Sequence, residues 1–173
     1  MTNRNELLLQ RCASYSEDSL VATNYLDNET VKGNAFSALF THTFLAAGTT
    51  QFTLDCPDGA FMLPIDAQSS AGTLTIKFYE GTDYTSSTDI GFINRNRKST
   101  HVATSKLLDA SAGADKGDLL ATFVVGTAGR GAYLGGGSGS SAPYILNGDN
   151  YLIEVTATDA CEATFGIGVI EYD

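Results

Sequence analysis

The amino-acid sequence predicts an all-β fold, an antiparallel β-sandwich for which the jelly roll is the leading topology. Three observations support this prediction. Apolar and polar residues alternate along most of the chain from Phe36 onward. Thr, Phe and Tyr are abundant, and 18 glycines supply turns. Turn signals such as Asp58-Gly59 separate about eight or nine strands, and a sheet of that size splits into two packed layers.

Each alternating run places its apolar side chains on one face, as expected for an antiparallel strand with one buried and one solvated side. The clearest turn signal is Asn147-Gly148, which predicts a hairpin because apolar runs flank it on both sides. The residues predicted to share a buried face are Phe36, Ala38, Phe40, His42 and Phe44; Phe52, Leu54 and Cys56; Leu74, Ile76 and Phe78; Leu119, Ala121, Phe123 and Val125; Tyr151, Ile153 and Val155; and Phe165, Ile167 and Val169.

Residues 1–35 differ from the rest and are predicted to form an N-terminal arm or short helix, whereas residues 36–173 form the β-sandwich domain. Leu8, Cys12 and Tyr15 follow a helical spacing. A helix of about three turns is marginal on its own, so the arm either packs on its own domain or contacts another subunit. No second helix is expected after residue 35, and the glycine-rich stretch 135–141 is expected to be an exposed loop.

The composition argues against several classes of protein. The formal charge is −10, so we expect neither a nucleic-acid binder nor a membrane binder, since both need a basic surface. No apolar run approaches the roughly 18 residues of a membrane-spanning helix, and the first residues lack the apolar core of a signal peptide. Three cysteines without a CxxC spacing indicate reduced thiols in a reducing cytoplasm, rather than a disulfide framework or a zinc site.

No set of residues marks a catalytic site. His42 lies on a Phe-rich strand face and is expected to be a hydrogen-bonded core residue, while His101 follows basic residues and is expected to be exposed. The sequence contains neither GxSxG nor GxxxxGK[ST]. Two histidines are too few for the metal site that a jelly-roll hydrolase of the cupin type needs. We therefore expect no enzymatic activity, no catalytic residues, no cofactor and no metal.

Charge is unevenly distributed along the chain. Residues 94–106 hold Arg95, Arg97, Lys98 and Lys106 with no acidic residue, and we call residues 94–101 the basic turn. Residues 131–173 hold six acidic residues and no basic one. This separation suits a contact between proteins, although two solvated faces would give the same pattern.

Short motifs occur in a recognisable order along residues 30 to 173. They are Val31-Lys32-Gly33-Asn34-Ala35-Phe36, Lys77-Phe78-Tyr79-Glu80-Gly81-Thr82, Ile93-Asn94-Arg95-Asn96-Arg97, a later glycine-rich tract, Pro143-Tyr144-Ile145-Leu146-Asn147, Tyr151-Leu152-Ile153-Glu154-Val155-Thr156 and Val169-Ile170-Glu171-Tyr172. Together they resemble small structural proteins of tailed bacteriophages, described as head decoration or cement proteins. The resemblance implies a jelly roll or related sandwich that attaches to a virion as a homo-oligomer, a dimer or a trimer.

From this resemblance we expect a non-enzymatic virion protein on the capsid surface, made in the cytoplasm of the host bacterium. Its partner would be the major capsid protein on the outer head, and binding would stabilise the assembled shell. The candidate contacts are Leu7, Leu8 and Leu9 in the arm, and Arg95 and Arg97 in the basic turn. The alternative is a tail or fibre module that binds host glycans through some of the eight tyrosines.

Overall fold

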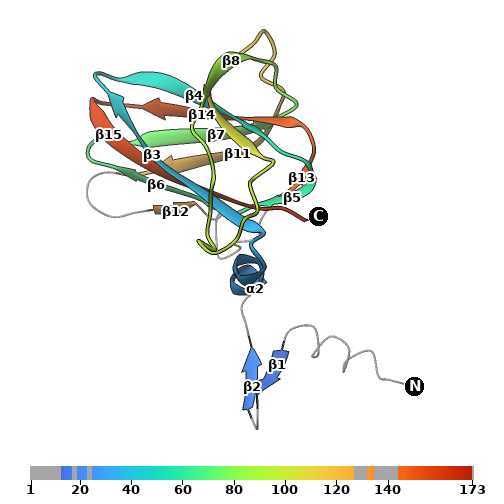
Figure 1. Ribbon diagram of the computed structural model, residues 1–173. Helices are drawn as coiled ribbons and strands as arrows, with labels where there is room; N and C mark the ends of the chain where they lie inside the picture. The colour runs from blue at the N-terminus through green and yellow to red at the C-terminus, as the bar shows by residue number, and fades with distance from the viewer. Residues whose placement is uncertain (1–12, 17–18, 23–24, 127–131, 135–143, 173) are drawn as a thin grey trace.

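The computed structural model describes residues 13–16, 19–22, 25–126, 132–134 and 144–172, which are mostly β-strands (Figure 1). Strands β1 (Ala13–Ser16) and β2 (Ser19–Ala22) form a small sheet of their own. Helix α2 (Tyr25–Lys32) follows. The remaining strands are β3 (Ala35–Phe44), β4 (Gly48–Asp55), β5 (Asp58–Met62), β6 (Ile65–Ser69), β7 (Leu74–Glu80), β8 (Tyr84–Asp89), β9 (Ile93–Asn94), β10 (Lys106–Ala112), β11 (Asp118–Val125), β12 (Ala132–Leu134), β13 (Tyr144–Asn147), β14 (Asn150–Ala157) and β15 (Cys161–Ile170).

Two antiparallel sheets lie face to face around one hydrophobic core. The six-stranded sheet has the order β11-β7-β14-β4-β10-β8; the seven-stranded sheet has the order β12-β6-β15-β3-β9, with β5 beside β15 and β13 beside β5. Phe52 on β4 and Phe165 on β15 meet across the layers, with ring centroids 5.8 Å apart. The predicted antiparallel β-sandwich is confirmed.

The long strands pair in a nested order. Strand β3 pairs with β15, β4 with β14, β5 with β13, β6 with β12, and β7 with β11, always antiparallel. The pairs alternate between the two layers, apart from the successive pairs of β5 and β6, which share the seven-stranded sheet. The first and last strands of the domain therefore lie side by side, with Ile170 at the end of β15 opposite Ala35 at the start of β3, close to helix α2 (Figure 1).

The strand count is higher than expected from the sequence, because some strands are interrupted. Thirteen strands, β3 to β15, follow the helix in the described part of the chain, where we expected about eight or nine. Strands β5 and β6 run along the same partner, β15, and are separated at Leu63 and Pro64. Pro64 has no N–H to donate, while the Leu63 N–H donates to the Gly168 carbonyl at 2.8 Å.

The turn at Asn147-Gly148 forms, but the predicted hairpin is wrong. Strand β13 before the turn pairs with β5, whereas β14 after it pairs with β4 and β7 in the other sheet. The Asn147 N–H donates to the Tyr151 hydroxyl at 2.9 Å, and that hydroxyl lies 2.9 Å from Oε1 of Glu80. Burial raises the pKa of Tyr151 to about 12. These side-chain bonds hold a turn that carries the chain from one layer to the other.

The predicted face of Leu119 is also wrong. Ala121, Phe123 and Val125 pack on the core as expected, but the register of β11 shifts between Leu119 and Ala121. A β-bulge of this kind moves the residues beyond it to the opposite face. Leu119 is consequently opposite Tyr79 and is 53% exposed.

The short helix lies later in the chain than the spacing of Leu8, Cys12 and Tyr15 suggested. Tyr15 belongs to strand β1, where it is opposite Leu20, and Leu8 and Cys12 lie outside the described residues, as does the stretch 135–141. Serines around Tyr15 favour extended backbone over a short, marginal helix. No helix follows residue 35 in the described ranges, and none of the described residues form a helix long and apolar enough to cross a membrane.

A polar cluster forms around Glu154 on the outer side of the six-stranded sheet. The Glu154 carboxylate on β14 is almost fully buried and accepts hydrogen bonds from Nε2 of Gln51, at 2.9 Å, and from Nζ of Lys116. Burial by itself raises the pKa of Glu154, but the bonds from Lys116 and Gln51 and the charge of Lys77 lower it below its ordinary value of 4.5. The cluster therefore favours the ionised carboxylate.

Acidification should destabilise the protein through this cluster. Because the folded-state pKa of Glu154 lies below the unfolded-state value, its contribution is complete above pH 4.5 and is lost as the pH falls through the folded-state pKa. Glu154→Gln should therefore flatten the pH dependence of Tm between pH 5 and pH 2, roughly the interval over which such carboxylates titrate. The measurement is thermal unfolding followed by circular dichroism, with the exposed Glu162→Gln as control. An equal change in both variants would contradict the prediction.

Candidate functional site

Three segments from distant parts of the sequence meet where helix α2 joins the sandwich. They are residues 31–36, the basic turn and the C-terminal residues 170–172. The Arg95 N–H donates to the Ala35 carbonyl at 2.9 Å, and the Glu171 N–H donates to the Asn34 carbonyl at 3.0 Å. Three of the motifs noted in the sequence are thus neighbours in space, and we call this region the junction.

Helix α2 ends at the junction in a Schellman turn. The Asn34 N–H donates to the Glu29 carbonyl at 2.9 Å, and the Gly33 N–H to the Thr30 carbonyl at 3.0 Å. Gly33 has a φ of 87°, in the left-handed region that glycine adopts at little cost. A Cβ at Gly33 would lie 2.3 Å from Oγ of Ser99 in the basic turn. Glycine is therefore required both by the turn and by the close approach of the basic turn.

Two asparagines attach the basic turn to the helix. Nδ2 of Asn94 donates to the carbonyls of Gly33, at 2.8 Å, and His101, at 3.1 Å. Nδ2 of Asn96 donates to the Val31 carbonyl at 2.9 Å. The bonds to Val31 and Gly33 satisfy carbonyls at the end of the helix, where no further intrahelical N–H groups are available. The basic turn therefore has a defined position relative to helix α2.

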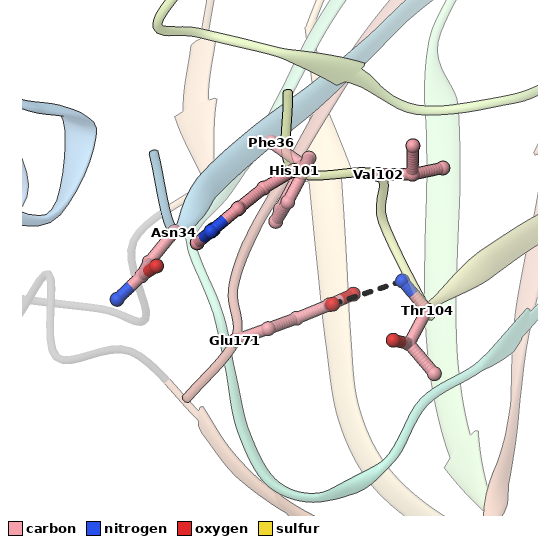
Figure 2. A pocket seen from close by; sticks show the side chains of 6 residues that line it. All are labelled: Asn34, Phe36, His101, Val102, Thr104 and Glu171. Carbon is pink, nitrogen blue, oxygen red and sulfur yellow. Dashed lines mark hydrogen bonds between the residues drawn. The ribbon is translucent and has the colours of Figure 1, made fainter. Parts of the chain in front are cut away.

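A small hollow of about 180 Å³ opens beside the junction (Figure 2). Figure 2 shows the Glu171 side chain reaching toward the backbone of Thr104, with His101 and Val102 on the same loop. The Glu171 carboxylate accepts the N–H groups of Thr104, at 2.9 Å, and Ser105, at 2.7 Å. Both carboxylate oxygens are engaged, so Glu171 anchors the loop. His101 is exposed, as expected.

A larger groove of about 430 Å³ adjoins the junction on the open face of the seven-stranded sheet. Leu39 on β3, Leu63 and Asp66 line it, together with Leu26 of helix α2 and Arg95 of the basic turn. The groove is thus continuous with the junction. Its surface is mainly apolar, and it has one charged residue of each sign.

The cations of the basic turn remain available to a partner. Arg95, Arg97 and Lys98 are exposed. Within the described residues none of them forms a salt bridge, whereas the nearby Lys32 pairs with Glu29 at 2.8 Å. Three exposed positive side chains thus form a local concentration of positive charge on a protein of charge −10.

The structure places two of the five predicted contact residues at this site. Arg95 and Arg97 are both exposed there, while Leu7, Leu8 and Leu9 lie outside the described residues. Sequence reasoning missed the roles of Asn94 and Asn96, although asparagine alternating with arginine was a visible signal. It also missed Leu39, an apolar residue on the otherwise polar face of its strand. Either role can be found only when one knows which segments, distant in the sequence, lie close to these residues in space.

The two described cysteines are buried, and His42 is half-buried. No group of three His, Cys, Asp or Glu side chains suited to a metal occurs among them. Burial raises the pKa of the Cys56 thiol to about 12, so it stays protonated, and Cys161 is also buried and free. His42 is half-buried with its ring 4.7 Å from that of Phe44, and within the described residues its side chain forms no hydrogen bond, unlike the bonded core histidine predicted.

Comparisons of this protein with protein-family models, with curated proteins and with solved structures found no match.

Proposed function

We propose that this protein is a non-enzymatic structural protein of a bacteriophage virion, a decoration or cement protein that binds the major capsid protein on the outer head surface. The observation that carries the proposal is the junction. There Asn96 holds the exposed basic turn against helix α2, and the arm that contains Leu7, Leu8 and Leu9 precedes that helix in the sequence. The cationic contact candidates therefore lie at the end of the sandwich that adjoins helix α2, and the apolar candidates precede that helix in the sequence.

We infer that the sandwich is a jelly roll. The nested strand pairs run from the outermost pair, β3 with β15, to the innermost pair, β7 with β11. Along this series the pairs pass from one sheet to the other. Nested pairing of this kind is expected when one long hairpin wraps into a double sheet. A wrapped fold of this kind supplies a stiff scaffold for the junction. A role in scaffolding needs no active site.

Binding at the junction would stabilise a shell by simple linkage. A protein that binds only the assembled lattice shifts the equilibrium toward it by mass action, and many copies on a symmetric shell multiply modest contacts. The exposed arginines would favour encounter with an acidic capsid surface. Apolar side chains of the arm would then bury apolar surface against the capsid, which they cannot bury within the arm itself.

Cryo-electron microscopy of the assembled particle tests the proposal directly. We expect regular density on the outside of the head, at symmetry axes, with helix α2 and the basic turn facing the capsid. Density confined to the tail would overturn the proposal in favour of attachment to host glycans. Absence of the chain from purified virions would overturn both.

Reversing the charge of Arg97 should weaken binding to heads that lack this protein. We expect the apparent Kd to rise about tenfold and to depend less on salt, because a charge at the edge of an interface acts mainly through association. The measurement is co-sedimentation of Arg97→Glu with purified heads at two salt concentrations. Lys106→Glu is the matched control, since Lys106 is exposed at the start of β10 rather than in the basic turn. Equal losses in both variants would show only a general charge effect.

A further inference from the structure

The open face of the seven-stranded sheet carries few charged residues. The strand registers place its outward residues in four rows across the strands. In a chain of net charge −10, Asp66 and Glu162 are the ionisable residues among them, and Glu162 does not line the groove. The rows are Ile93, Ser37 and Gly168; Leu39, Gly166 and Asp66; Thr41, Thr164 and Gln68; and Thr43 and Glu162.

Exposed apolar side chains lie on this face beside bare backbone. Leu39 is 78% exposed and Ile93 is 57% exposed. A Cβ at Gly168 would lie 2.8 Å from Cδ1 of Leu63, so glycine lets that leucine lie against β15. Gly166 is directly opposite Leu39 and adds no side chain of its own. Leu39, Leu63 and the two glycines line the groove of about 430 Å³, and Ile93 lies outside it on the same face. A contiguous apolar surface of this kind indicates an interaction site.

The two charged residues of the groove lie on opposite flanks. The strand order across the face is β6-β15-β3-β9. Asp66 is on β6, and Arg95 directly follows β9. Both line the groove, yet they are not paired with each other, and neither forms a salt bridge within the described residues. One flank of the face is therefore positive and the other is negative.

Such a face is complementary to a second copy of itself. A two-fold axis parallel to the strands would place the β6 flank of one copy opposite the β9 flank of the other, and Arg95 would meet Asp66 twice. A three-fold ring would form the same contact once at each interface. Both arrangements close, as stable homo-oligomers do.

We propose that this face joins copies of the protein, with Leu39 buried in the contact and Arg95 of one copy paired with Asp66 of the next. The inference adds to the proposed function but does not depend on capsid binding. It assigns Arg95 to the contact between copies and leaves Arg97 to face the capsid. A surface that is apolar at its centre and charged at its edges is typical of such interfaces.

The first test is the mass of the full-length protein in solution, measured by sedimentation velocity. We expect a discrete oligomer of the 18.2 kDa chain, and Leu39→Lys should raise its dissociation constant at least about a hundredfold. Leu45→Lys is the control, because Leu45 is 91% exposed and does not line the groove. A wild-type monomer at high concentration, or equal loss in both variants, would overturn the proposal.

The second test exchanges the charges. Asp66→Arg and Arg95→Asp should each dissociate the oligomer, because each places like charges opposite one another. The double variant should restore the wild-type mass, while Arg97→Asp should leave it unchanged. If both single variants are folded by circular dichroism and the double variant stays monomeric, the proposed pairing is wrong.

The third test separates this contact from the arm. Replacing Leu7, Leu8 and Leu9 by serine in the full-length chain should leave the oligomer intact. Dissociation of this variant would assign the groove to the arm and overturn the proposal. Loss of capsid binding with the oligomer intact would support the capsid role of the arm, so the two proposals succeed or fail separately.

Discussion

Replacing Phe165 by alanine should lower the free energy of unfolding by about 3–5 kcal/mol. Phe165 is fully buried on β15, in the middle of the core. Its ring lies 5.3 Å from that of Phe40 in its own sheet and 5.8 Å from that of Phe52 in the opposite sheet. The substitution removes contacts that join the two layers and leaves a cavity between them, which the surrounding strands cannot easily fill.

Urea unfolding followed by circular dichroism measures this loss. Val124→Ala is the control, because Val124 is 64% exposed and its truncation should change stability by no more than about 0.5 kcal/mol. Domains are stable by only about 5–15 kcal/mol, so Phe165→Ala should be substantially unfolded at moderate urea. A loss of less than about 1 kcal/mol would contradict the placement of this ring in a tightly packed core.

Gly33→Ala should cost about 2–5 kcal/mol and should also displace the basic turn. The left-handed backbone at Gly33 costs an alanine about 1–2 kcal/mol, and a clash in a packed site adds about 1–3 kcal/mol. The clash is specific, since the new Cβ would lie 2.3 Å from Oγ of Ser99 and 2.8 Å from its Cβ. Relief requires the basic turn to move away from helix α2.

Gly81→Ala is the matched control for this prediction. Gly81 has a φ of 72°, but a Cβ there would meet nothing within 4 Å. Its loss of stability should therefore report the backbone cost alone. Hydrogen exchange should show faster opening of amides in residues 94–101 only for Gly33→Ala. Equal losses of stability and unchanged exchange would mean that the basic turn does not depend on the end of helix α2.

The candidate site was predicted from the sequence only in part. The arginines of the basic turn were recognised because four cations without an acid form a local signal in residues 94–106. Their attachment to helix α2 was not predicted, because Asn94 and Asn96 bond to carbonyls of residues 31–33, far away in the chain. The groove was not predicted either, since Leu39 belongs to it only through its neighbours Gly166 and Asp66.

The sequence by itself determined the fold class and the buried face of most strands. The reason is local, because the pleat of a strand imposes a two-residue period on burial, and residues such as Ile76 and Ile153 follow it into the core. Only the tertiary structure decided which strands pair. Asn147-Gly148 joins strands of different sheets because β13 pairs with β5. Leu119 faces outward because of a bulge in β11. Strand partners and bulges depend on hydrogen bonds between distant segments, which no local pattern records.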